Sequence, residues 1–546
     1  MGKTNAKNRN NLFFSGVLIL TVANLLVKVI GLIYKIPLHQ YLGDEGMGYF
    51  NSAYRIYTAF YLVSTGGLPV AVSILVSRAR AQGNKKEVKT IFKSAVTLFF
   101  CIGAIGALIM IIGAKGFANL MGNGPAYLSI LAIAPTLFFI CICSAIRGYF
   151  QGYQNMLPTA VSEVLEALGK LVLGILFAVY ALDKGYSLPA VAAFALLGLT
   201  LGVFAGTVYI VIHRIFFKSE AYDAEFIDNP DAPVRSVKQI IKALFIIAIP
   251  ISVSSSVMSI ADLIDTVVIQ RTLQALGHTR AMASALFGNY STLAVPMYNM
   301  PTVLIYPISC SIVPYVSSAI AENNMEKAKE VMTSSLKIAS LIAIPSALGL
   351  SVLSKPILSL LFSNAESVNR AAPLLSVLAI AVFFVGMLSV TNAILQANSH
   401  ERLPIISMFT GAVVKVAMSF ILMNILGRVA SGYEMFGAPL GTVLCYMTIA
   451  ILNFIFIAKK IGLVPDFKAV FLKPFLAAVP CVIAAMLSYK LLESGNAKIA
   501  TLAAIMVAVI VYLIAVLLFR VISKEEIMMM PKGKKIYGLL HKMKLM

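Results

Sequence analysis

The chain has 546 residues, of which 59% are hydrophobic and 12% are charged, and its formal net charge is +21. A soluble globular domain carries about 25% charged residues, so this composition excludes a soluble protein and predicts a polytopic membrane protein. Most Lys and Arg residues lie in short segments between apolar runs. This distribution indicates contact with anionic lipid headgroups and excludes a nucleic-acid partner.

Apolar segments of about 18 or more residues recur along the whole chain. Their length and continuity predict helices rather than a β-barrel, so the expected fold class is an all-α polytopic membrane protein. About fourteen transmembrane spans are expected, near 12–36, 48–77, 94–114, 126–148, 158–180, 190–213, 243–269, 284–319, 338–354, 371–396, 404–427, 437–458, 474–491 and 500–520. A Gly-Gly-Leu-Pro sequence at 66–69 and several prolines in the eighth span predict bent helices.

Basic segments predict the orientation of these spans. The segments at Arg78–Lys89, at 214–242 and in the tail at 532–544 are rich in Lys and Arg, whereas the alternate loops hold few. The positive-inside rule therefore predicts that both termini are cytoplasmic. The N-terminus has a basic head and a long apolar run without a clear cleavage site, which indicates a retained first span.

An internal repeat is visible in two pairs of segments. Residues 67–96 parallel residues 305–336, because both contain a proline, small residues, a Gly-Asn or Asn-Asn break and then a short charged helix. Residues 147–172 parallel residues 392–417: both contain Gln, then Leu-Pro, then Lys, and Gln and Lys are equally far apart in the two copies. Two similar halves in the same orientation predict a transporter core with a central cavity.

The repeat predicts two pseudo-symmetric lobes of six helices followed by two C-terminal helices. The predicted organisation is an N-lobe at 1–213, a cytoplasmic linker at 214–242, a C-lobe at 243–458, and spans 13 and 14 with a basic tail at 459–546. In the sixth span, glycines recur at every fourth position between 198 and 206, which predicts close helix packing.

Cations inside the apolar spans are candidate binding residues. Lys28 and Lys35 lie two helical turns apart on one face of the first span, and Arg55 lies in the second. A charge at this depth is costly and indicates a function by default. Such a cluster in a cavity would bind an anion, most simply a phosphate or pyrophosphate headgroup. The alternative is that each side chain reaches the membrane interface or pairs with a carboxylate.

Two further lysines are embedded in later spans. Lys170 lies in the fifth span and Lys415 in the eleventh. For both we favour a structural role, and Lys170 is expected to pair with Glu163 or Glu166 of its own span.

The seventh span carries a polar stripe. Ser255, Ser259, Asp262 and Thr266 recur every three or four residues, and Asp265 lies one turn from Asp262. Two carboxylates in a membrane helix could bind a coupling cation or carry a proton. The alternative is a hydrogen-bonded face between helices, or a salt bridge from these carboxylates to Lys28 or Arg55.

The first two spans also carry a resemblance. The segments LVKVIGLIYKIPLHQYLGDEGMGYFNSAYRIY (26–57) and STGGLPVAVSILVSRARAQGN (64–84), with the fourteen-span layout, resemble the multidrug/oligosaccharidyl-lipid/polysaccharide flippase superfamily. Within it, the chain is similar to the group that contains polysaccharide biosynthesis proteins, stage V sporulation protein B and lipid II flippases. The resemblance covers nearly the full length and implies a multi-pass protein of the bacterial cytoplasmic (inner) membrane.

The resemblance implies a function and a set of site residues. It implies that an undecaprenyl-pyrophosphate-linked cell-wall precursor, or a polysaccharide unit, moves from the inner to the outer leaflet by alternating access. Lys28, Lys35 and Arg55 would bind the diphosphate, and the lipid tail would lie in a groove that involves the last two spans. The eighth-span region at 288–301 carries no charge, unlike the lipid II flippases, which leaves the cargo headgroup open.

Some members of the superfamily bind sodium. The resemblance therefore implies Asp262, Asp265, Asn392 and Gln396 as ion-coupling residues for Na⁺ or H⁺. No covalent chemistry is expected, so the chain is predicted to be no enzyme, with no catalytic residues, structural metal or cofactor. The alternative function is a cation-coupled multidrug or small-molecule antiporter of the same fold, which should have an acidic cavity.

Overall fold

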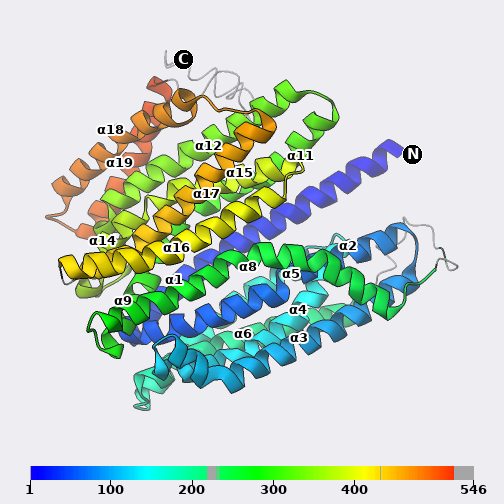
Figure 1. Ribbon diagram of the computed structural model, residues 1–546, viewed down its shortest axis with the longest axis horizontal. Helices are drawn as coiled ribbons and strands as arrows, with labels where there is room; N and C mark the ends of the chain where they lie inside the picture. Colours follow the sequence, from blue (N-terminus) through cyan, green and yellow to red (C-terminus); the bar gives the residue numbers. More distant parts are fainter. Residues whose placement is uncertain (1, 218–228, 230–232, 431, 520, 522–546) are drawn as a thin grey trace. The chain divides into compact units, whose positions relative to one another are not determined.

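The computed structural model describes residues 2–217, 229, 233–430, 432–519 and 521. Over these residues the chain is helical and contains no β-strand (Figure 1). The basic tail at 532–544 and part of the predicted linker at 214–242 lie outside the described residues. The expected cytoplasmic location of both segments stays a prediction.

The helices follow one another with short connections. The first half contains α1 (Gly2–Thr65), α2 (Leu68–Ala81), α3 (Lys85–Leu120), η1 (Gly124–Ala126), α4 (Tyr127–Gly152), α5 (Leu157–Asp183), α6 (Leu188–Phe216) and α8 (Val237–Ala275). The chain continues with α9 (Arg280–Asn289), η2 (Tyr290–Ala294), α10 (Val295–Asn299), α11 (Thr302–Ala321), α12 (Met325–Val352), α13 (Ser354–Leu361), α14 (Ala365–Leu378) and α15 (Ala381–Ala397). The last helices are α16 (Arg402–Val429), η3 (Glu434–Phe436), α17 (Gly437–Ile461), η4 (Lys468–Leu472), α18 (Lys473–Leu492) and α19 (Ala497–Leu518).

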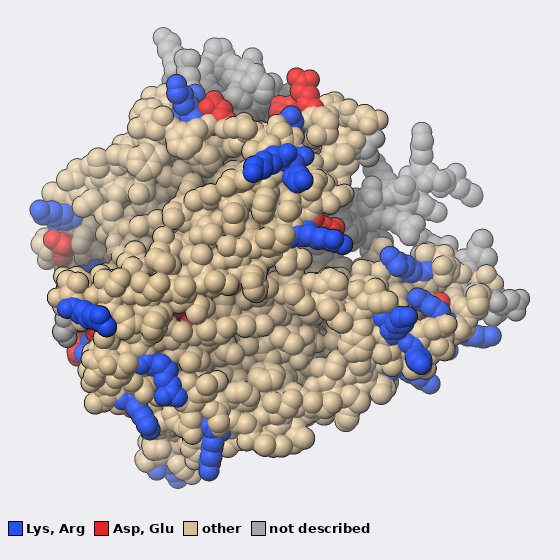
Figure 2. Space-filling model, in the orientation of Figure 1, with Lys and Arg blue, Asp and Glu red and all other residues tan. Residues whose placement is uncertain are grey.

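The long helices have the length and composition of membrane spans. Eleven of the described helices could cross a membrane, or twelve if the bent pair α14 and α15 counts as one span. Each predicted apolar segment coincides with a helical segment, and the proline-rich eighth corresponds to α9, η2, α10 and α11. In Figure 2 most of the visible surface carries no charged residue, and Lys and Arg lie mainly toward its edges. The chain is therefore a multi-pass membrane protein, as predicted.

The chain forms two compact units, Met1–Gly288 and Asn289–Met546. Helix α8 belongs to the first unit, where it packs against α1, α2 and α3. The backbone N–H of Gly67, in the break between α1 and α2, donates a hydrogen bond to Ser252 Oγ of α8 at 2.9 Å. This packing differs from a C-lobe that begins at 243 and includes α8. The lobes drawn from the sequence repeat, an N-lobe at 1–213 and a C-lobe at 243–458, stay a prediction.

Matching turns support the internal repeat. The turn before α3 has Gly83 at φ 69°, and the turn before α12 has Asn323 at φ 56°. The next residue in each case caps the following helix, because Asn84 Oδ1 accepts from the N–H of the third residue on and Asn324 does the same. The two sequence copies at 67–96 and 305–336 therefore fold into the same local motif.

The second repeated pair gives the same result. Gln154, after α4, and Ser399, after α15, both adopt a φ of 59°, a left-handed conformation that is uncommon outside glycine. Leu-Pro then opens α5 and Arg-Leu-Pro opens α16. Proline suits the first turn of a helix because the first N–H groups have no partner within the helix.

Glycines allow α5 and α6 to pack closely. A Cβ atom on Gly198 would lie 2.2 Å from the backbone nitrogen of Gly174, and one on Gly169 would lie 2.4 Å from the Cα of Gly202. Both positions therefore require glycine, since real Cβ atoms do not approach backbone so closely. The predicted role of the glycines at 198–206 in close helix packing is confirmed.

Candidate functional site

A break in α1 brings the cations of its two halves together. Gly43 has φ 62° and ψ −173°, a non-helical conformation that favours glycine. In a straight helix, Lys35 and Arg55 would lie about 30 Å apart, at 1.5 Å per residue. Lys35 instead interacts electrostatically with Arg55 and with Lys170 of α5. Three cations from α1 and α5 thus converge within the first unit.

Aromatic rings surround Lys170. Its Nζ lies 5.0 Å from the ring centroid of Tyr34 and 4.9 Å from that of Tyr54, both in α1. An ammonium over an aromatic face is stabilised by the ring quadrupole, and more strongly where water is excluded. The Tyr34 hydroxyl also donates to the carbonyl oxygen of Ala195 in α6 at 3.4 Å. Tyrosines therefore hold Lys170 beside the other two cations.

The expected pairing of Lys170 with Glu163 or Glu166 is wrong. Arg147 of α4 takes that place: its guanidinium lies 2.6 Å from Glu166 Oε1 and 4.0 Å from Glu163 Oε1, and it donates to Ser162 Oγ at 2.9 Å. The Arg147 side chain is 8% exposed. A guanidinium can contact two neighbouring carboxylates at once through different N–H groups, which a lysine ammonium does less well, so Lys170 remains with the cation cluster.

Arg55 forms an ion pair with the polar stripe of α8. Its Nη1 donates to Asp262 Oδ2 at 2.8 Å, and both side chains are partly exposed, at 26% and 29%. Asp265 is buried, and the Thr266 hydroxyl donates to the backbone carbonyl of Asp262 at 2.8 Å. The salt bridge from this stripe to Arg55 is thus present, and cation binding by Asp262 and Asp265 stays a prediction.

Lys28 lies apart from this cluster, two turns before Lys35 in α1. Its side chain is exposed, as are those of its neighbours Leu25 and Val29. The structure therefore brings Lys35, but not Lys28, next to Arg55 among the predicted cargo residues.

The predicted ion-coupling residues of the second unit lie on α15. The side chain of Asn453 in α17 donates to Asn392 Oδ1 at 2.8 Å and to Thr391 Oγ1 at 3.0 Å, and it accepts from Ser407 Oγ at 2.6 Å. Gln396 is exposed at the end of the same helix. Asn392 therefore belongs to a buried amide and hydroxyl network, whereas Gln396 does not take part in these contacts.

The two repeat copies differ at this network. In the aligned copies Arg147 corresponds to Asn392, and Lys170 corresponds to Lys415. The first unit thus has a buried ion cluster where the second has neutral amides. Lys415 is 5% exposed, and the structural role expected for it stays a prediction.

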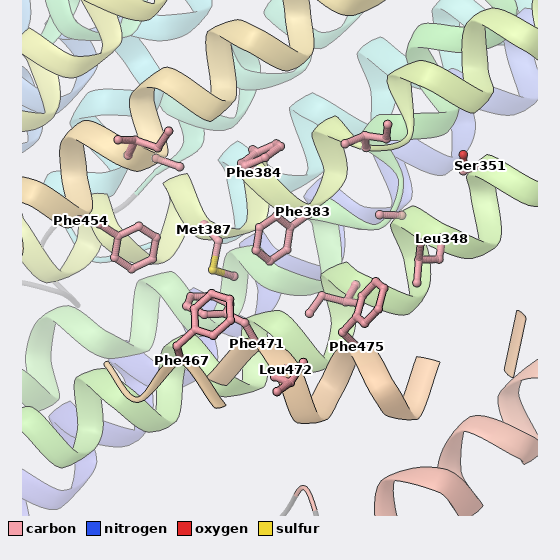
Figure 3. Close-up of a pocket in the computed structure, with 15 residues that line it drawn as sticks. Leu348, Ser351, Phe383, Phe384, Met387, Phe454, Phe467, Phe471, Leu472 and Phe475 are labelled. Atoms are coloured by element: carbon pink, nitrogen blue, oxygen red, sulfur yellow. The ribbon is translucent and has the colours of Figure 1, made fainter. Parts of the chain in front are cut away.

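An apolar pocket of about 770 Å³ lies in the second unit. Helices α12, α15, α17 and α18 line it, together with η4. Figure 3 shows the rings of Phe383 and Phe384 on one side and those of Phe467, Phe471 and Phe475 on another. Apolar side chains make up nearly the whole lining, so the pocket suits a hydrocarbon chain rather than a polar group. One of the last two spans, α18, forms one wall.

Sequence reasoning missed Arg147 and Asn453 as members of the polar networks. Both lie in strongly apolar helices, and an intramembrane Arg is itself a signal of a buried ion pair. The row of tyrosines in α1 was also missed: the rings of Tyr54, Tyr57 and Tyr61 follow one another at centroid distances of 5.9 Å. Their spacing of three and four residues places them on one helix face.

The chain is similar to known proteins. The model of the polysaccharide biosynthesis protein family matches residues 13–320, and the MatE model matches residues 250–421. Stage V sporulation protein B of Bacillus subtilis (strain 168) is 25% identical over 524 residues, which cover 95% of this chain and 98% of that protein. The lipid II flippase MurJ of the same organism is 24% identical over 461 residues, 82% of each chain.

A solved structure has the same fold. The lipid II flippase MurJ in an inward closed conformation superposes with a TM-score of 0.68 at 16% identity, covering 91% of this chain and 98% of that one. This likeness agrees with the all-α transporter fold expected from the sequence. Since the family model matches more than half of the residues, the chain belongs to the polysaccharide biosynthesis protein family of the multidrug/oligosaccharidyl-lipid/polysaccharide flippase superfamily.

Proposed function

We propose that this protein is a flippase that moves a lipid-linked saccharide, attached through a pyrophosphate, from the inner to the outer leaflet. The cation cluster of Lys35, Arg55 and Lys170 is the observation that carries the proposal. The relative named a lipid II flippase supports this class of cargo. The chain would work in the bacterial cytoplasmic membrane with both termini in the cytoplasm, and it would catalyse no covalent step.

The charges of the cluster suit a diphosphate. Lys35, Arg55 and Lys170 lie close enough to repel one another, and Asp262 pairs with Arg55. Like charges so placed repel each other, and an anion with a negative charge on each phosphate would relieve that repulsion. Lys28, exposed two turns earlier on α1, would make the first electrostatic contact with the approaching headgroup.

The apolar pocket of the second unit would take part of the polyprenyl tail. Its volume of about 770 Å³ and its phenylalanine lining match the chemistry of a branched hydrocarbon chain. A cargo with an anionic head and a long apolar tail would then use a basic site and an apolar site on the same protein. A soluble sugar nucleotide has no apolar tail, so it would use only the basic site.

Asp262 would link cargo to a coupling cation. An incoming phosphate would compete with Asp262 for Arg55, and Asp262, once released, would favour Na⁺ or H⁺ in its place. Asp265 and Asn392 are further candidate coupling residues, and exposed Gln396 is the weakest of the four. Cargo and cation would therefore both bind more strongly when the Arg55–Asp262 ion pair is open than when it is closed. A ligand must have such a difference in affinity between two states to drive a conformational change.

The test is depletion of this protein in its host. Labelling with a membrane-impermeant probe would then measure lipid-linked precursors in the outer leaflet. We expect exposure of the cargo to fall and the cargo to accumulate in the inner leaflet. The wild-type gene and Lys184→Gln should restore exposure, whereas Lys170→Gln should not. Lys184 follows α5, the helix of Lys170, and is exposed, so it controls for loss of a lysine.

The levels of both variants in the membrane would be measured in parallel. Lys28→Gln should reduce the rate of export less than Lys170→Gln does. Full restoration by Lys170→Gln would overturn the assignment of the cation cluster to cargo. Unchanged exposure of every lipid-linked saccharide after depletion would overturn the flippase function itself.

A cation-coupled antiporter of the same fold is the second candidate, because the MatE model matches residues 250–421. A binding site for cationic drugs should carry excess negative charge. The converging cations of the first unit argue against it. Resistance of the host to cationic drugs should therefore not change on depletion.

A further inference from the structure

A second basic site lies in the first unit, away from the cation cluster. A pocket of about 480 Å³ is enclosed by the end of α3, by η1 and the start of α4, by the start of α6 and by the start of α9. Its lining includes two cations, Lys115 and Arg280, and no acidic residue. Both cations are exposed, so an anion can reach them from solvent or from the headgroup region.

The backbone around this pocket also favours an anion. Helix α6 and the η1–α4 segment both begin at the pocket, and the start of a helix is the positive end of its dipole, although Pro125 and Pro189 have no N–H to donate there. The Ser187 side chain, at the N-cap of α6, makes no capping hydrogen bond and lines the pocket. Helix starts and basic side chains together are the usual elements of a phosphate site in proteins.

Neighbouring contacts orient Lys115 and bring a further cation close to the pocket. The Lys115 ammonium lies 5.8 Å from the ring centroid of Tyr127, which also lines the pocket. Arg271 of α8 donates to the backbone carbonyls of Asn119 and Leu120 at the end of α3. These bonds occupy the negative end of α3 and place one more positive charge beside the pocket.

We propose that this pocket binds a phosphate group, carried either by a lipid headgroup or by free phosphate. Lys115 and Arg280 would each donate charge-assisted hydrogen bonds to phosphate oxygens. The Ser187 hydroxyl would donate to a remaining oxygen, and the positive end of the α6 dipole would add to the attraction. The site lies where helices end, which is the level of headgroup phosphates in a bilayer. On the orientation proposed above, it faces the outer leaflet, but phosphate binding does not depend on that orientation or on transport.

The test measures how strongly a phosphate ligand protects Lys115 from chemical acetylation. The purified full-length protein would be treated with acetic anhydride, and peptide mass spectrometry would give the rate at each lysine. Exposed Lys184 is the internal control, because it lies outside the pocket at the same end of the first unit. The probes are inorganic phosphate, dioctanoyl phosphatidylglycerol, and phosphate-free dioctanoylglycerol.

At a ligand concentration ten times its Kd, acetylation of Lys115 should slow about tenfold, since only the unoccupied site reacts. Lys184 should react at an unchanged rate, and dioctanoylglycerol should protect neither lysine. Protection by phosphatidylglycerol alone would identify the ligand as a lipid headgroup. Protection by inorganic phosphate as well would identify the phosphate group itself as sufficient.

The Arg280→Gln variant makes the test specific to this pocket. It removes the second cation without touching Lys115, and protection of Lys115 should be largely lost. The proposal is overturned if Lys115 and Lys184 are protected equally, if neither is protected, or if Arg280→Gln leaves protection intact. The acetylation assay does not measure precursor export. Its result would therefore stand even if the proposed flippase function were wrong.

Discussion

The ion cluster of Arg147 offers the sharpest test of the packing in the first unit. At an effective dielectric constant of about 20, the Arg147–Glu166 contact at 2.6 Å has a Coulomb energy of about 6 kcal/mol. Desolvation offsets much of this gain. Arg147→Met would nevertheless leave the partly buried Glu163 and Glu166 without their guanidinium, and removing one partner of a buried ion pair costs up to about 3–5 kcal/mol.

Thermal unfolding in detergent would measure this cost. The chain has no Trp, so a thiol-reactive fluorogenic dye is the suitable reporter. Cys141 and Cys143 are buried in α4 beside the cluster and would react only as the unit opens. We expect Arg147→Met to lower the melting temperature by several degrees. Arg78→Met, an exposed arginine in α2, should stay within about 0.5 kcal/mol of wild type.

A triple variant separates the effect of charge from that of packing. Arg147→Met combined with Glu163→Gln and Glu166→Gln removes all three charges and nearly preserves volume. It should recover most of the lost stability, because neutral amides cost less to bury than unpaired carboxylates. A melting temperature of Arg147→Met equal to that of wild type would refute the reasoning. So would a triple variant that is no more stable than the single variant.

Two further predictions concern other contacts of the first unit. Asp262→Asn removes the charged partner of Arg55, so the cation cluster should bind inorganic pyrophosphate several-fold more tightly, by about 1 kcal/mol for a partly exposed ion pair. Isothermal titration would measure this, and unchanged or weaker binding would contradict the competition proposed between cargo and Asp262. Gly198→Ala would place a Cβ 2.2 Å from the Gly174 backbone and should lower the melting temperature, whereas Gly116→Ala, with no atom within 4 Å, should not; equal effects would contradict the packing argument.

The sequence by itself determined the class and the helices of this protein. Apolar runs longer than about 18 residues have few alternatives to spanning helices, and each one coincides with a helical segment. The repeat was equally accessible, because the break before a short charged helix that it predicts depends on a few neighbouring residues. The glycines at 198–206 indicated close packing for the same reason: their effect follows from the absence of a side chain.

Only the tertiary structure decided which charges meet. Lys35 and Arg55 are 20 positions apart and come together because the chain departs from the helix at Gly43. Sequence spacing favoured Lys170 as the partner of Glu166, but Arg147 of the neighbouring helix occupies that carboxylate. The basic pocket with Lys115 and Arg280 joins residues from helices far apart in the chain. Helix formation depends on interactions over a few residues, whereas ion pairs inside a membrane depend on which helix faces are neighbours, and no local pattern encodes that.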